Sequence, residues 1–209
     1  MSALITPSLV GSVEWNIKCP PSYKEKARQD LVNQLSRIWD DSPKPEIQLG
    51  KQFEDAVYAA AQKGKPHDGS KFFNEVVQMC EGAIFQKKTT SYVKIDGIEY
   101  CLYGKIDAAF PEFLIDIKTT RNYRGEDHYL STVQHKMYCY NEQITEFHYV
   151  VVEFAKTGNT IVDVHNIPYF VVSRESLKEE LITQVKNTIG FISDDEELSR
   201  LYKTTFGLY

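Results

Sequence analysis

The sequence lacks the long apolar runs and the paired cysteines that mark membrane-spanning or disulfide-stapled chains. Nowhere do 18 apolar residues stand together, which excludes a helix that crosses a bilayer. Residues 1–15 contain neither a basic region nor a continuous apolar stretch, so we expect no signal peptide and a cytoplasmic location. The cysteines form no C-x-x-C motif and no zinc-finger spacing with histidine, and we expect them to be buried and reduced. They are Cys19, Cys80, Cys101 and Cys139.

Motifs of several enzyme classes are also missing. No G-x-x-x-x-G-K-[ST] loop occurs, so the phosphate-binding loop of ATPases and helicases is absent. The five histidines form no H-E-x-x-H pair. What remains is an ordinary globular composition over 209 residues, with 42% hydrophobic and 25% charged residues, which favours one domain. The net charge of -5 argues weakly against a general nucleic-acid coat protein but leaves room for a local basic groove.

Hydrophobic periodicity predicts helices at both ends of the chain and strands in the middle. Helical spacing occupies the segments 19–41, 50–64, 70–80 and 128–143, and the chain is helical again from Ser173, a predicted N-cap. Strands are expected around 83–110, broken by a hairpin turn at Asp96-Gly97, and at 113–120, 146–156 and 160–170. The expected fold is α/β (α+β), a central mixed sheet of about five strands flanked by helices. We divide it into a helical part (1–82), a sheet core (83–172) and C-terminal helices (173–209).

The stretch FLIDIKTT, residues 113–120, places opposite charges inside an apolar strand. Alternation puts Asp116 and Lys118 on one face, and we expect the other face to be the core side. If Pro111 and Glu112 form a two-residue turn, Asp107 lies directly opposite Asp116, with Cβ atoms roughly 4.5–5.5 Å apart. Carboxylates at that distance repel one another unless a cation separates them. Oxygen ligands favour Mg²⁺ or Mn²⁺.

Three further side chains extend this pattern. Lys118 can stabilise charge on an attacked phosphate, which together with two acids indicates metal-assisted phosphodiester hydrolysis. Gln134 and Tyr138 share a helix face that can look back over the strand ends, and Glu54 can supply a third acid. Taken singly, each of these features is more often a solvated or half-buried side chain than part of a site.

The order of these motifs resembles the PD-(D/E)xK nuclease superfamily, within it the RecB-like and phage-exonuclease branch. The resemblance runs from about residue 5 to residue 155 and includes an ITPSLVGSVEWNIKCP opening with Ser…Cys-Pro. It implies a restriction-endonuclease-like core. It also implies metal ligands, a catalytic lysine and two residues that complete the site. The implied set is Glu54, Asp107, Asp116 and the Ile117 carbonyl for the metal, Lys118 as the lysine, and Gln134 and Tyr138.

The cofactor implied is Mg²⁺ or Mn²⁺. An iron–sulfur cluster, which some relatives hold, is not expected, because no cysteine follows Cys139 and four thiolates are needed. Just past Lys118, the side chains of Arg121, Tyr123 and Arg124 can clamp phosphates and stack on a base, although a solvated loop is an equal alternative. His128 and His135 lie close enough in sequence to touch DNA.

The resulting prediction is a metal-dependent DNA nuclease of recombination, repair or phage DNA processing, with exonuclease action favoured. DNA is the expected partner, with a single-strand annealing or recombination protein and a second copy of the chain as further candidates. The organism expected is a bacterium or its phage. Two alternatives stay open: a non-catalytic nucleic-acid-binding protein on the same scaffold, and an enzyme of different chemistry in which Asp107 and Asp116 only pair with cations.

Overall fold

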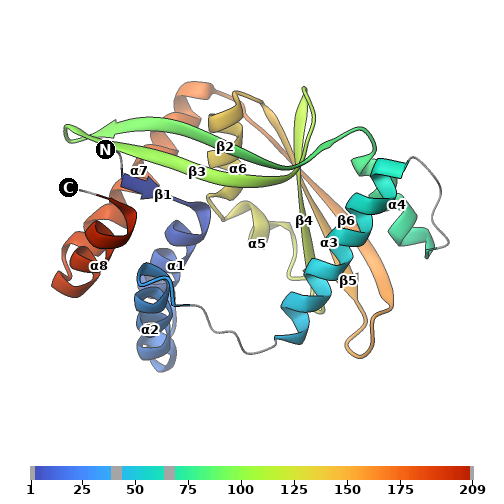
Figure 1. Ribbon diagram of the computed structural model, residues 1–209, viewed down its shortest axis with the longest axis horizontal. Helices are drawn as coiled ribbons and strands as arrows, with labels where there is room; N and C mark the ends of the chain where they lie inside the picture. The colour runs from blue at the N-terminus through green and yellow to red at the C-terminus, as the bar shows by residue number, and fades with distance from the viewer. Residues whose placement is uncertain (1–2, 39–43, 64–68, 208–209) are drawn as a thin grey trace.

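The computed structural model describes residues 3–38, 44–63 and 69–207, which form a twisted mixed sheet between two layers of helices (Figure 1). The sheet runs β1-β3-β4-β5-β6, and β2 pairs with β3 on the edge opposite β1. Pairing is parallel for β1–β3 and β4–β5 and antiparallel elsewhere. The strands are β1 (Ala3–Ile5), β2 (Ile84–Ile95), β3 (Ile98–Ala109), β4 (Phe113–Thr120), β5 (Glu146–Phe154) and β6 (Ile161–Phe170).

Helices precede, interrupt and follow the sheet. They are α1 (Pro7–Lys18), the short 3₁₀ turn η1 (Pro21–Tyr23), α2 (Lys24–Leu35), α3 (Pro45–Lys63), α4 (Lys71–Cys80), α5 (Glu126–Leu130), α6 (Gln134–Glu142), α7 (Arg174–Ser193) and α8 (Glu196–Phe206). Ser173 accepts a hydrogen bond from the Ser176 N–H, which confirms the predicted cap of α7. Within the described part of the chain, no helix is long and apolar enough to cross a bilayer.

The structure confirms the predicted mixed sheet flanked by helices and corrects several elements. The sequence analysis missed β1 and α1 and joined α5 and α6, which are separated by residues 131–133. Ile38 lies beyond the end of α2 and is 60% exposed, so it does not belong to the apolar stripe of that helix. The proline-rich helix stop was placed at 41–45, of which 41–43 lie outside the described residues.

Both faces of β4 are buried, whereas the sequence analysis assigned the core to one face. Ile115 and Ile117 pack with side chains of α3 and α4. Leu114, on the opposite face, packs with Phe147 of β5 in the larger core, which includes residues of α1, α6 and α7. A strand with a parallel neighbour in the middle of a helix-covered sheet is normally buried on both sides. Asp116 is therefore only 2% exposed, which makes its charge expensive to hold.

Two tight turns set the register of the strands that carry the acids. Asp96 and Gly97 both have positive φ angles, 50° and 85°, as the predicted two-residue hairpin requires, and Ile95 pairs with Ile98. At the next turn Phe110 N–H donates to the Phe113 carbonyl, and Ala108 pairs with Ile115. The predicted turn is confirmed, but the ladder ends at the pair Ala108–Ile115, so Asp107 and Asp116 are the next positions in register without being a paired rung.

Gly104 of β3 lies under the ring of Tyr138, which reaches over from α6. A Cβ at position 104 would stand 2.1 Å from Tyr138 Cε1 and 3.0 Å from its Cδ1. Such contacts force a ring or a backbone to move, because the protein interior is close-packed. The absence of a side chain at Gly104 is therefore what lets α6 pack closely on the hairpin.

We expect Gly104→Ala to lower the free energy of unfolding by about 1–3 kcal/mol, the usual cost of overpacking. Urea denaturation of both proteins measures it. Gly190→Ala in α7 is the control, since its Cβ would meet no atom within 4 Å. Equal stability of Gly104→Ala and the unchanged protein would contradict the packing described here.

Candidate active site

The β3 and β4 strands stop pairing after Ala108 and Ile115, and the carboxylate of Asp107 takes the place of the next ladder bond. Ile117 N–H donates to Asp107 Oδ2 at 2.9 Å. The other oxygen, Oδ1, accepts from Gln86 Nε2 at 3.1 Å. Asp107 thus lies where the two strands diverge, a place that we call the β3–β4 fork, bounded by Asp107 and Ile117.

Asp116 of β4 precedes Ile117 at the β3–β4 fork, and its carboxylate has two partners. Its Oδ2 forms an ion pair with Lys118 Nζ at 2.6 Å. Its Oδ1 accepts a hydrogen bond from Gln134 Nε2, and Gln134 is the first residue of α6. Tyr138, one turn later, donates its hydroxyl to the Lys105 carbonyl at 2.9 Å and lies 3.4 Å from Gln134 Nε2. The shared helix face of Gln134 and Tyr138 does look onto the strand ends.

Helix α3 brings Glu54 to the same place. Gly50, one turn before Glu54, has no room for a Cβ, which would lie 2.7 Å from Thr119 Oγ1, so α3 approaches β4 closely there. Glu54, Asp107, Asp116 and Lys118 border one hollow of about 540 Å³, which we call the site hollow. The rest of its wall is Glu46, Ile47, Gly50, Lys51, Lys105, Ile117, Thr119 and Gln134.

The carboxyl groups of the site hollow raise one another's pKa. Burial, reinforced by Asp116 and Glu54, raises the pKa of Asp107 to about 8. The pKa of Glu54 is raised by burial first and then by Asp116. Burial alone would lower the pKa of Lys118, but the attraction of Asp116 and Asp107 outweighs it, and that pKa is raised. Lys118 is thus a charged ammonium facing two acids.

The donor atoms of this site suit a hard divalent cation. Carboxylate and carbonyl oxygens are the ligands that Mg²⁺ and Mn²⁺ prefer. Among the described residues, no three carboxylate, imidazole or thiol side chains are arranged to hold a metal ion in the conformation seen. At Asp116 the ammonium of Lys118 lies against Oδ2 as the local positive charge.

Two of the three side chains expected to bind DNA past Lys118 have other partners. Arg121 donates to the carbonyls of Ala155 and Gly158, at 2.7 Å for the latter, and so holds the β5–β6 turn. The ring of Tyr123 stacks on His165, with centroids 3.7 Å apart. Arg124 is exposed. Of these three side chains, only that of Arg124 extends into solvent without a protein hydrogen bond or ring contact among the described residues.

The expectation that His135 touches DNA is wrong for this structure. Its side chain is 0% exposed, its Nδ1 lies 3.2 Å from the Tyr149 hydroxyl, and burial lowers its pKa to about 3. It stands one position past Gln134 on α6, so it faces the core instead of the site. His128, by contrast, is exposed.

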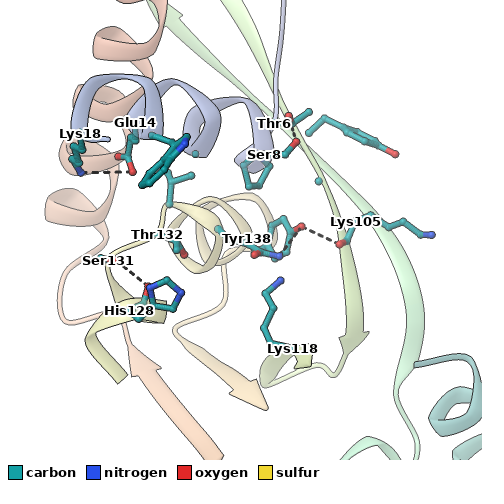
Figure 2. Close-up of a pocket in the computed structure, with 17 residues that line it drawn as sticks. Thr6, Ser8, Glu14, Lys18, Lys105, Lys118, His128, Ser131, Thr132 and Tyr138 are labelled. Carbon is teal, nitrogen blue, oxygen red and sulfur yellow. Dashed lines mark hydrogen bonds and ion pairs between the residues drawn. The ribbon is translucent and has the colours of Figure 1, made fainter. Parts of the chain in front are cut away.

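Two features of the site escaped the sequence analysis. Gln86, with a positive φ of 54°, lies opposite Asp107 on β2 and bonds both Asp107 and the Tyr58 hydroxyl. The second feature is a hollow of about 650 Å³ beneath α1, which we call the α1 hollow and which meets the site hollow at Lys118 (Figure 2). The α1 hollow is lined by Thr6, Pro7, Ser8, Gly11, Glu14, Trp15, Lys18, Tyr103, Gly104, Lys105, Lys118, His128, Ser131, Thr132, Val133, Gln134 and Tyr138.

No family model matches the sequence, and neither does any curated protein. Solved structures share its fold. An alkaline exonuclease (LHK-Exo) from Laribacter hongkongensis is 14% identical, with a TM-score of 0.55 over 96% of this chain and 92% of that one. Its complex with dAMP gives 14% identity and a TM-score of 0.53, with the same coverage. A phage-related exonuclease from Haemophilus somnus 129PT is 11% identical, with a TM-score of 0.51 over 98% and 95%.

Both exonucleases belong to the branch that the sequence motifs resemble. The resemblance is therefore confirmed at the level of the fold, which is what identities this low can show. Their fold covers nearly the whole of this chain.

The raised pKa of Asp107 predicts a pH-dependent stability. Between pH 4 and pH 8 the unfolded chain loses the Asp107 proton while the folded chain keeps it, so the free energy of unfolding falls as the pH rises. We expect the free energy of unfolding to fall less between pH 5 and pH 8.5 in Asp107→Asn than in the unchanged protein. The difference should exceed about 1.4 kcal/mol, the free energy that corresponds to one pKa unit.

Urea denaturation in EDTA at the two pH values measures this change. Asp127→Asn, which alters an exposed carboxylate on α5, is the control and should leave the fall unchanged. A fall of the same size in Asp107→Asn and in the unchanged protein would show that Asp107 is not the group responsible.

Proposed function

We propose that the chain is a metal-dependent nuclease that hydrolyses DNA phosphodiester bonds, acting as an exonuclease in recombination, repair or phage DNA processing. The observation that carries the proposal is the β3–β4 fork. Beside it Asp107 and Asp116, from neighbouring strands, border one hollow together with Lys118 and Glu54. The exonucleases that share the fold support the direction of the proposal, and one of them has been crystallised with dAMP.

Asp107, Asp116 and the Ile117 carbonyl would hold the cation, with Glu54 as the nearby third acid. When bound, a Mg²⁺ or Mn²⁺ ion supplies Lewis-acid activation of the phosphate and of the attacking water. The two acids come from different strands, and Glu54 comes from a helix. Their separation therefore depends on the packing of α3 on β4 through Gly50 and Thr119.

The chain's own residues perform the remaining tasks. The Lys118 ammonium donates hydrogen bonds to a phosphate oxygen and stabilises the negative charge that builds up as water attacks phosphorus and the ester P–O bond breaks. Gln134 donates to Asp116 and fixes the direction of its carboxylate. Tyr138, anchored on the Lys105 carbonyl, keeps Gln134 in place.

A pair of lysines beside the site indicates an anionic polymer as the substrate. Lys88 of β2 is the cross-strand partner of Lys105 of β3, and both are exposed. Like charges directly opposite one another destabilise a sheet. Neither lysine forms an ion pair within residues 3–38, 44–63 and 69–207, and Lys105 also borders both hollows. Phosphates of a bound strand would relieve the repulsion.

Substitution of the site tests the activity. We expect Asp116→Asn and Lys118→Ala each to lower Mg²⁺-dependent cleavage of end-labelled linear DNA by at least about 10²-fold, because Asp116 would hold the cation and Lys118 would stabilise charge on the phosphate. Lys186→Ala, an exposed lysine of α7, is the control. Undiminished cleavage by both variants would refute the assignment, and DNA binding without any cleavage by the unchanged protein would favour a non-catalytic binding protein.

The lysine pair makes a separate prediction for binding. Lys88→Gln with Lys105→Gln should weaken binding of a DNA oligonucleotide in EDTA. It should also make the slope of log K against log salt shallower by about 1.4–1.8, because two phosphate contacts are lost. The melting temperature should stay the same or rise, since the repulsion is gone. Fluorescence anisotropy over a salt series measures it. An unchanged slope would mean that the pair does not contact phosphates.

A further inference from the structure

Gln86 of β2 has a backbone conformation that residues with a side chain rarely adopt. Its φ angle is 54°, in the left-handed region, where glycine, asparagine and aspartate are the usual residues. In the β2–β3 ladder the rungs on either side of this position are formed, but Gln86 and Asp107 are not paired. Strained backbone of this kind persists only where the surrounding structure holds it, and it gathers at functional sites. The side chain of Gln86 shows what holds it here.

The side-chain amide of Gln86 uses both of its hydrogens. Its Nε2 donates to Asp107 Oδ1 at 3.1 Å and to the Tyr58 hydroxyl oxygen at 2.7 Å. An ionised carboxylate only accepts hydrogen bonds, so the contact with Asp107 requires the nitrogen end of the amide. The amide is therefore held from two sides, by β3 and by α3.

Gln86 completes the set of protein donors on the Asp107 carboxylate. Ile117 N–H donates to Oδ2 at 2.9 Å and Gln86 to Oδ1, so each oxygen has one donor. Donors on both oxygens fix the plane of the carboxylate as well as its position. A carboxylate oxygen has two lone pairs, so each keeps one for a further partner, and Asp107 borders the site hollow. A cation in the hollow would meet an acid that is already oriented.

The same amide connects Asp107 to the helix that carries Glu54. Tyr58 lies one turn after Glu54 on α3, so the two side chains share a helix face. Tyr58 is buried, and its ring packs on that of Phe85, with centroids 4.7 Å apart. Gln86 thus bridges a fixed tyrosine of α3 and the acid of β3. It contributes to the spacing between two of the proposed metal ligands.

We propose that Gln86 is a positioning residue for the cation: its amide orients Asp107 and holds α3, with Glu54, beside it. This inference rests on the proposed function and adds a residue that acts through Asp107 without touching the substrate. Outer hydrogen-bond partners of metal ligands typically contribute about 10–100-fold to metal affinity. Such a contribution accounts for a glutamine at a position where glycine would fit the backbone with less strain.

The test measures Mn²⁺ binding without DNA, from the electron paramagnetic resonance signal of the free ion. Gln86→Met removes the amide and keeps the length of the side chain. Gln86→Gly also removes the amide but suits the φ angle of 54°, so urea denaturation should show a stably folded protein. We expect both variants to bind Mn²⁺ at least about 10-fold more weakly. Gln78→Met, the same change at an exposed glutamine of α4, is the matched control and should leave the affinity unchanged.

A second comparison tests whether Tyr58 acts through Gln86. Tyr58→Phe should weaken Mn²⁺ binding less than Gln86→Met does, because the amide remains but loses one anchor. In the Gln86→Met protein the same change should cause no further loss, since no amide is left for the hydroxyl to hold. Losses that add in the double variant would overturn the bridge between α3 and Asp107.

The outcomes separate this inference from the nuclease assignment. Asp116→Asn should weaken the measured binding, which assigns the Mn²⁺ to the site hollow. Unchanged Mn²⁺ affinity in Gln86→Met and Gln86→Gly overturns the role of Gln86 even if DNA is cleaved. Weaker affinity in both variants of a protein that cleaves no DNA sustains the positioning role and refutes the nuclease. Failure of the unchanged protein to bind Mn²⁺ overturns both.

Discussion

The hydrogen bond from the Ile117 N–H to the Asp107 carboxylate is the interaction on which the site depends. A backbone N–H that leaves a sheet ladder in a buried place needs another acceptor. Asp107 supplies one, which lets β3 and β4 separate without an unpaired donor. Lys118, further along β4, borders both the hollow on the α3 side and the hollow on the α1 side. One carboxylate thus both ends the ladder and borders the site hollow.

The surroundings of the β3–β4 fork serve mainly to hold Gln134 and Glu54 at fixed positions. The Tyr149 hydroxyl lies 2.9 Å from Thr132 Oγ1 and 3.2 Å from His135 Nδ1, so it ties down the turn between α5 and α6 and sets where α6 begins. His135 is therefore an anchor for the helix that presents Gln134. The buried side chains of Tyr149 and His135 hydrogen-bond one another where no water reaches them. This contact satisfies polar atoms inside an otherwise apolar core.

The strand register could be read from the sequence because two short turns fix it. Counting back from Asp96-Gly97 places Gln86 opposite Asp107, and Pro111-Glu112 places Asp107 opposite Asp116. Other parts carry no such local signal. The three-residue β1 is defined by its pairing with β3, and the approach of α3 to β4 depends on one glycine facing one threonine far along the chain. Periodicity also could not show that helices cover both faces of β4.

The ion pair between Lys118 and Asp116 has a consequence for how the protein matures. Small metal domains such as zinc fingers fold only as they bind the metal, because their ligands have no other reason to assemble. Here the acids already have partners from the chain itself: Lys118 and Gln134 for Asp116, and Ile117 and Gln86 for Asp107. The proposed cation is therefore not needed to assemble these acids, and the chain would fold before binding it.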